Sequence, residues 1–425
     1  MAFQQGLSGL DASSSQLNAI GNNIANASTV GYKSSNTQFS DIFASAFNGS
    51  SASSIGIGTQ VANVAQNFSQ GNIQTTGNSL DMAINGLGFF RMSNNGTISY
   101  TRDGQFQLNN KGDLVDAFGN SVTGYQATSA GTIVAATPVP LQIPTSNLAP
   151  TSTSSATVGV NLNSSSTVPA TTPFNPTDPT TFNNSTSMTV YDSLGNSHIA
   201  TVYFSLVTPT PASVTAAGGT AAWNTYLTMD GTAVPPAATP IGTLGFNASG
   251  TMVYPAATGT LKTGQVSVSV PFTNGATTPQ AMTLDFSSTT QYGSPFGVNQ
   301  LSQNGYASGQ LSGFSVSSTG IIQGNYSNGQ SKNLGQIALA NFADSQGLQS
   351  IGNNQWAQTN ASGNALVGAP GTGNLGAIQS GATEGSNVNL TTELVNMITA
   401  QRNYQANAQT IKTEDQITQT LVNLR

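Results

Sequence analysis

The sequence predicts a mainly β protein with α-helical termini. Near both ends, apolar residues recur every three to four positions, as on one face of a helix. Between the ends, short strand-like runs alternate with Asn-Gly and Asp-Gly turns. No apolar run approaches the roughly 18–20 residues of a membrane span. At 425 residues the chain is long enough for roughly two to four domains.

The first expected helix occupies residues 1–30, and its apolar stripe has heptad spacing. The stripe positions that we expect to face a partner helix are Leu7, Leu10, Leu17 and Ile24. The stripe leads into IGNNIANASTVGYK, which contains the uncharged amides Asn22, Asn23 and Asn26. Asparagine loosens a helix and favours caps and turns. A plain helix stop therefore explains the break but not the number of amides.

The middle of the chain divides by composition into nested parts. Residues 31–75 form a connector, and residues 76–144 with 298–375 form a discontinuous middle β domain. Residues 145–297 form an outer β domain, entered through a Thr-, Ser- and Pro-rich stretch that marks a boundary. Within it, a hairpin is expected around Asp192–Asn196, followed by the strand candidates WNTYLTM, TMVYP, QVSVSVPF and AMTLDF.

The second expected helix lies within residues 376–425. Its apolar stripe consists of Leu390, Leu394, Met397, Tyr404, Ala408 and Ile411. Two further apolar residues, Leu421 and Leu424, lie about half a turn around the helix from this stripe. Asn389 or Thr391 is expected to cap its start, and Glu393 suits the first turn because of the helix dipole. The two helices are expected to pair as a coiled coil. The simpler alternative is that the two helices pack together on an ordinary globular domain.

The groups that carry most catalytic and metal chemistry are scarce. The chain has no cysteine and one histidine, His198, which we expect to be an exposed or hydrogen-bonded strand residue. No G-x-S-x-G elbow accompanies it. Asp103, Asp113 and Asp116 lack calcium-loop spacing and are better explained as turn residues. We therefore expect no enzyme activity, no cofactor and no metal.

The charge pattern excludes other classes of partner. Only 6 % of residues are charged, against roughly 25 % in an average protein, and the net charge is −6 without a basic cluster. Nucleic-acid binding is therefore not expected.

The N-terminus has neither the basic region nor the continuous apolar region of a signal peptide. If the protein acts outside the cell, another route exports it.

Four segments resemble the bacterial flagellar rod and hook proteins. They are LSGLDASSSQLNAIGNNIANASTVGYK, TGNSLDMAINGLGFFRM, TRDGQFQLNNKGDLVDAFGNSVTGY and SNVNLTTELVNMITAQRNYQANAQTIKTEDQITQTLVNLR. Other stretches, such as MTVYDSLGNSH, LGQIALANF and NQWAQTNASG, look like hook-protein segments. The resemblance implies a subunit that polymerises into the curved tube between rod and filament, transmits torque and encloses the export channel. The three asparagines would then bond between subunits.

The resemblance also implies partners and a location. Partners would be further copies of the chain, the flagellar rod, the hook cap, the hook-filament junction proteins and the flagellar type III export apparatus. The location would be the extracellular flagellar hook, without membrane insertion. Phe39 and Phe43 in FSDIF match the F-x-x-x-F spacing presented to the export gate. On a helix their rings would share one face.

Two other functions remain open at this point. A distal rod or junction subunit shares the ends, although rod proteins generally lack the large outer domain. A secreted β-rich adhesin belongs to another class. The termini discriminate, because helices that lack partners until assembly are expected to be disordered in a monomer.

Overall fold

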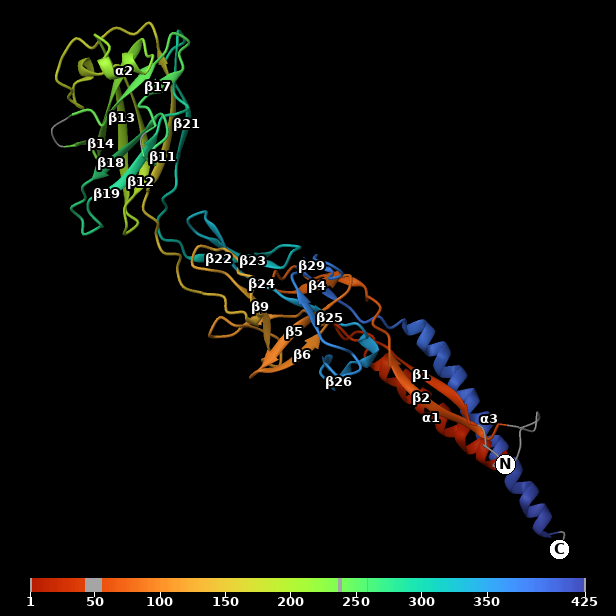
Figure 1. The fold of residues 1–425 in the computed structure, drawn as a ribbon. Coiled ribbons are helices and arrows are strands. Elements are labelled where there is room, and N and C mark those ends of the chain that lie inside the picture. The colour runs from red at the N-terminus through yellow and green to blue at the C-terminus, as the bar shows by residue number, and fades with distance from the viewer. Residues whose placement is uncertain (1, 43–55, 236–238, 258, 424–425) are drawn as a thin grey trace. The chain divides into compact units, whose positions relative to one another are not determined.

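The computed structural model describes residues 2–42, 56–235, 239–257 and 259–423. It contains two compact units (Figure 1). The first unit comprises Met1–Thr145, Ser312–Asn325 and Ser331–Arg425, and the second comprises Ser146–Leu311 and Tyr326–Gln330. The second unit extends past the expected boundary at residue 297, because β21 (Gly297–Gln303) pairs antiparallel with β11 (Ser155–Asn163).

The terminal helices lie side by side in the first unit. α1 (Ala2–Ala25) packs along α3 (Leu390–Asn423), and the hairpin of β1 (Ser35–Ile42) and β2 (Gly58–Gln66) packs against α1 (Figure 1). Two glycines allow this close approach. A Cβ at Gly6 would lie 2.9 Å from Ile411 Cγ1, and one at Gly9 would lie 2.8 Å from the Asn407 side chain. Small residues therefore set the spacing of the two helices.

α1 ends at Ala25, earlier than the expected residue 30. The backbone N–H of Asn26 donates to the carbonyl oxygens of Asn22 (3.1 Å) and Asn23 (3.2 Å), which closes the last turn. The chain then turns at Gly31, whose φ of +70° favours glycine. The asparagine-rich stretch thus ends the helix sooner than the apolar spacing indicates.

α3 begins as predicted. The Asn389 side-chain oxygen accepts a hydrogen bond from the Thr392 N–H at 3.2 Å, so the predicted Asn389 cap is confirmed. Glu393 lies in the first turn, where the helix dipole favours a negative charge.

The expected connector contains regular structure. Phe39 lies on strand β1 and not on a helix, because β1 pairs with β2 along its whole length from Ser35 to Ile42. The expectation that Phe39 and Phe43 share a helical face is therefore wrong, and Phe43 lies outside the described residues. Further along, β3 (Ile73–Thr75) pairs with β30 (Ala382–Glu384), just before α3.

The rest of the first unit is β structure around two apolar clusters. One pair of strands is β4 (Met82–Asn85) with β29 (Ala377–Ser380). A 13-stranded sheet comprises β5 (Phe89–Asn94), β6 (Thr97–Thr101), β7 (Gln107–Leu108), β8 (Leu114–Val115), β9 (Ser121–Gln126), β10 (Val139–Pro140), β22 (Leu311–Val316), β23 (Ile321–Tyr326), β24 (Ser331–Ile337), β25 (Leu339–Asn341), β26 (Gln349–Gly352), β27 (Gln355–Ala357) and β28 (Leu366–Gly368). A short 3-10 helix, η2 (Ser345–Gly347), precedes β26. Phe90 and Met92 are fully buried in the larger cluster, and Trp356 lies in the other.

The second unit contains two sheets that share one core. The five-stranded sheet comprises β11, β18 (Gln265–Val270), β19 (Gln280–Asp285), β20 (Thr290–Tyr292) and β21. The six-stranded sheet comprises β12 (Asn184–Tyr191), β13 (Ser197–Val207), β14 (Ala221–Met229), β15 (Thr232–Val234), β16 (Gly242–Phe246) and β17 (Met252–Tyr254), with α2 (Ala212–Ala216) and η1 (Pro179–Thr181) in its connections. Trp223, Phe204 and Phe286 are fully buried between the sheets. The predicted hairpin and the four strand candidates are confirmed.

Candidate assembly interface

The helix pair leaves large apolar side chains exposed. These side chains are Phe3, Leu7, Leu390, Leu394, Val395, Ile398, Tyr404, Ile417 and Val422. Leu394, Val395 and Ile398 are 45 %, 58 % and 51 % exposed and follow one another on α3. Contiguous exposed apolar surface on a protein marks an interaction site. The terminal helices are therefore suited to bind another protein surface.

The expected stripe residues divide between half-buried and exposed positions. Leu10, Leu17, Ile24, Met397, Ala408 and Ile411 are half-buried, whereas Leu7, Leu390, Leu394 and Tyr404 are exposed. Leu424 and the side chain of Leu421 lie outside the described residues. The contact between the helices instead uses Gly6, Gly9, Asn407 and Ile411. Sequence reasoning missed the two glycines, although their spacing of three was a usable signal.

Asn23 connects α1 to the start of β1 within one chain. It is 1 % exposed, and its amide donates to the Ser35 carbonyl oxygen at 2.8 Å while accepting from the Ser35 N–H at 2.9 Å. The Tyr32 hydroxyl donates to the same Asn23 oxygen at 3.1 Å. These bonds fix α1 to the start of β1, so they account for the burial of Asn23 without a second subunit. Asn22 and Asn26 bond to each other within α1 and its final turn.

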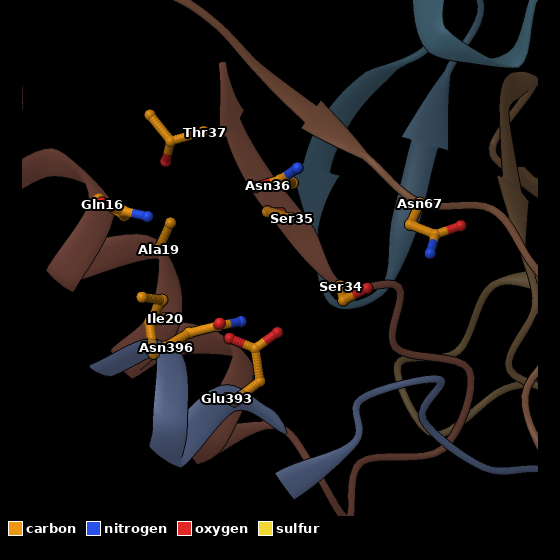
Figure 2. A pocket seen from close by; sticks show the side chains of 10 residues that line it. All are labelled: Gln16, Ala19, Ile20, Ser34, Ser35, Asn36, Thr37, Asn67, Glu393 and Asn396. Atoms are coloured by element: carbon orange, nitrogen blue, oxygen red, sulfur yellow. The ribbon is translucent and has the colours of Figure 1, made fainter. Parts of the chain in front are cut away.

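A polar pocket of about 240 Å³ opens between α1, α3 and the start of β1. Its lining residues are Gln16, Ala19, Ile20, Ser34, Ser35, Asn36, Thr37, Asn67, Glu393 and Asn396 (Figure 2). Figure 2 shows Glu393 and Asn396 reaching from α3 into the space between the helices and the strand. Among the described residues nothing forms a hydrogen bond or ion pair with the Glu393 carboxylate. Thr37 is 6 % exposed, and its hydroxyl also has no partner in that part of the chain.

A buried cluster of three charged side chains lies where both helices meet the inner strands. It consists of Lys33, Arg102 and Glu384 and is called the ionic joint below. The Glu384 carboxylate accepts from Lys33 Nζ at 2.6 Å, from Arg102 Nη1 at 2.9 Å and from the Gly71 N–H at 2.7 Å. The Lys33 and Glu384 side chains are fully buried. Burial lowers the pKa values of Lys33 and Arg102, and the Glu384 charge partly offsets this effect. Sequence reasoning missed this joint.

The residues considered for catalysis or metal binding have structural partners. His198 lies on β13, where its Nδ1 is 2.6 Å from Asp230 Oδ2 and its Nε2 is 3.2 Å from Asp192 Oδ2. The prediction that His198 is a hydrogen-bonded strand residue is therefore confirmed. The carboxylates of Asp103 and Asp116 accept backbone N–H bonds in turns, as predicted. Residues 2–42, 56–235, 239–257 and 259–423 contain no group of three potential metal ligands. In the same ranges no helix has the length and apolarity needed to cross a membrane.

Comparisons with known proteins cover the whole chain. The model of the "Flagellar basal body protein FlaE D2 domain" matches residues 161–306, and that of the "Flagellar hook protein FlgE/F/G D1 domain" matches residues 83–166. The flagellar hook proteins FlgE of Escherichia coli and Salmonella typhimurium are each 43 % identical over the full length of both chains. The chain belongs to the flagellar hook protein family.

A more distant relative belongs to the same family. The hook protein FlgE of Rhizobium meliloti is 33 % identical across all of this chain and 98 % of its own. The models "Flagella basal body rod protein" and "Flagellar basal body rod FlgEFG protein C-terminal" match residues 3–33 and 379–424, so the helical ends of this hook-family chain are shared with rod proteins. A Helicobacter pylori hook protein structure, FlgE2, covers 72 % of this chain and 99 % of its own, with 16 % identity and a TM-score of 0.49.

Proposed function

We propose that copies of this chain polymerise through α1 and α3 into the flagellar hook, a curved tube that transmits torque and encloses the export channel. The observation that carries the proposal is the exposed apolar surface of the helix pair, with Val395 and Ile398 more than half exposed. Burying such surface against another copy is favourable by roughly 25 cal/mol per Å². The full-length similarity to hook proteins supports the same assembly.

The composition suits a tube that must bend while it rotates. With 6 % charged residues, contacts between copies depend on small polar and apolar groups. Such contacts have alternatives of similar energy, whereas networks of Lys–Glu pairs favour one register, although each exposed pair contributes only about 0–1 kcal/mol. The proposed role is mechanical and involves no catalysis.

We further propose that the chain leaves the cell through the flagellar type III export apparatus and then contacts the rod, the hook cap and the junction proteins. Phe39 and Phe43 are the candidate recognition pair for the export gate. The test is secretion of Phe39→Ala/Phe43→Ala compared with Phe118→Ala, an exposed phenylalanine that has no second phenylalanine four residues away. Loss of secretion in the double variant alone supports recognition, and unchanged secretion contradicts it.

Electron microscopy of the purified full-length polymer tests the assembly itself. A short curved tube with a central channel is the expected result. A straight tube favours the rod or junction alternative. A protein that stays monomeric, and in which limited proteolysis leaves both terminal helices intact, favours an adhesin and contradicts the proposal.

A further inference from the structure

The polar pocket contains an unsatisfied negative charge. The Glu393 carboxylate has no hydrogen-bond or ion-pair partner among the described residues, and the amides of Gln16 and Asn396 beside it are likewise unpaired there. The Thr37 hydroxyl is buried in the pocket wall without a partner. Thr37 is the buried member of this set, and a buried polar atom without a partner is destabilising, whereas Glu393 and Gln16 are half-buried and Asn396 is exposed. The pocket is therefore suited to a ligand that donates several hydrogen bonds and carries a positive charge.

The same helix carries a cation without a partner. Arg402 is exposed on α3, and nothing in the described part of the chain pairs with it. Nine residues separate Arg402 from Glu393, which is half a turn in angle and about 14 Å along the helix axis. Because these side chains lie on opposite faces of one straight helix, they cannot pair within one copy.

Two exposed apolar side chains lie on the N-terminal side of Arg402. Val395 and Ile398 precede it by seven and four residues, so they lie on the same face of α3, and both are more than half exposed. Apolar side chains beside a charged contact exclude water and strengthen the contact. This face carries the positive charge that the pocket lacks and apolar side chains beside that charge.

We propose that Arg402 of one copy enters the pocket of the next copy and pairs with its Glu393. A guanidinium donates up to five hydrogen bonds and accepts none, which suits a carboxylate, a lone hydroxyl and amide oxygens. The contact joins different surfaces on the two copies, so it can repeat from copy to copy, and it generates a helical array when the repeated rotation does not close into a ring. The inference depends on the proposed hook assembly and specifies one contact within it.

Charge exchange in the full chain tests the pair. Arg402→Glu and Glu393→Arg are each expected to raise the critical concentration for tube formation at least tenfold, because each places like charges together. The double variant restores the opposite charges and is expected to return to within threefold of the wild type. Lys412→Glu is the matched control, since Lys412 is an exposed cation on the same helix, and it is expected to change the value less than threefold.

The result that overturns the pairing is a double variant that assembles no better than either single variant. Equal effects of Lys412→Glu and Arg402→Glu also overturn it, because net charge would then explain the loss. Wild-type protein that forms no tubes contradicts the proposed hook function instead, so the two failures are distinguishable.

Chemical cross-linking provides a second measurement that does not depend on assembly strength. The chain contains no cysteine, so single Glu393→Cys and Arg402→Cys variants each carry one thiol. In tubes formed from a mixture of the two variants, a short bis-maleimide is expected to link one variant to the other. Gln401→Cys mixed with Glu393→Cys is the control. Absence of mixed dimers, or equal yield from the control mixture, contradicts the proposal.

Discussion

Glu384→Gln tests whether the buried ionic joint holds the helices to the inner strands. The amide keeps the shape of Glu384 but removes the charge that compensates Lys33 and Arg102, whose side chains are 0 % and 3 % exposed. Removing one partner of a buried ion pair costs about 3–5 kcal/mol, because the remaining charge is left uncompensated. At about 2–4 °C per kcal/mol for a unit of this size, the melting temperature of the first unit should fall by about 6–20 °C.

Tryptophan fluorescence can follow the first unit alone. The chain has two tryptophans, Trp223 in the second unit and Trp356 in the first, so a Trp223→Phe background reports through Trp356. Trp356 packs against Phe89, and the Arg102 guanidinium lies 5.4 Å from the centre of the same Phe89 ring. Glu393→Gln, which removes an unpaired charge, is the control and should shift stability by about 0.5 kcal/mol or less. Equal melting temperatures for Glu384→Gln and this control would refute the reasoning.

Three further predictions concern hydrogen bonds and pH. Asn23→Ala should destabilise the first unit by about 1–3 kcal/mol in urea titrations, because it removes the partner of the half-buried Ser35 N–H and carbonyl groups, and Asn22→Ala should have little effect. Burial raises the pKa of Asp103 to about 6 in the folded chain, so ionising this carboxyl is less favourable there than in the unfolded chain. The free energy of unfolding of the first unit should therefore fall as pH rises from about 4 to about 6, and Asp103→Asn should abolish that fall. Burial lowers the pKa of His198, but hydrogen bonds to two aspartates outweigh this and raise it. The charged His198 side chain should therefore stabilise the folded second unit, and Trp223 fluorescence can follow its unfolding. This stabilisation should be complete below about pH 6.5 and decline as pH rises through the raised pKa, and it should be absent in His198→Ala.

Features that depend on local sequence were predictable. Asn389 caps α3 because its side chain accepts from an N–H three residues later. Asp192 closes the β12–β13 turn by accepting from the Leu194 and Asn196 N–H groups. Both interactions involve groups within four residues, so residue type and spacing were sufficient.

Features that join distant parts of the chain were not predictable from spacing. Lys33 and Glu384 are 351 residues apart, and no local pattern indicates that they meet. Asn23 looked available to neighbouring subunits because the sequence does not show that β1 returns to α1 and supplies Ser35. The export pair was considered in a helical setting, where four-residue spacing puts both rings on one face, but the same spacing also puts two side chains on one face of a strand.

The satisfied and unsatisfied polar groups of the first unit have different mechanical consequences. Glu384 and Asn23 are buried and form hydrogen bonds inside the chain, so moving the helices relative to the inner strands would expose charges or break several hydrogen bonds. Glu393 and Arg402 have no such partners among the described residues, and in the proposed assembly they would pair between copies. Deformation of a polymer therefore costs least at contacts between copies. A hook that bends during rotation would change those contacts while the ionic joint of each subunit stays intact.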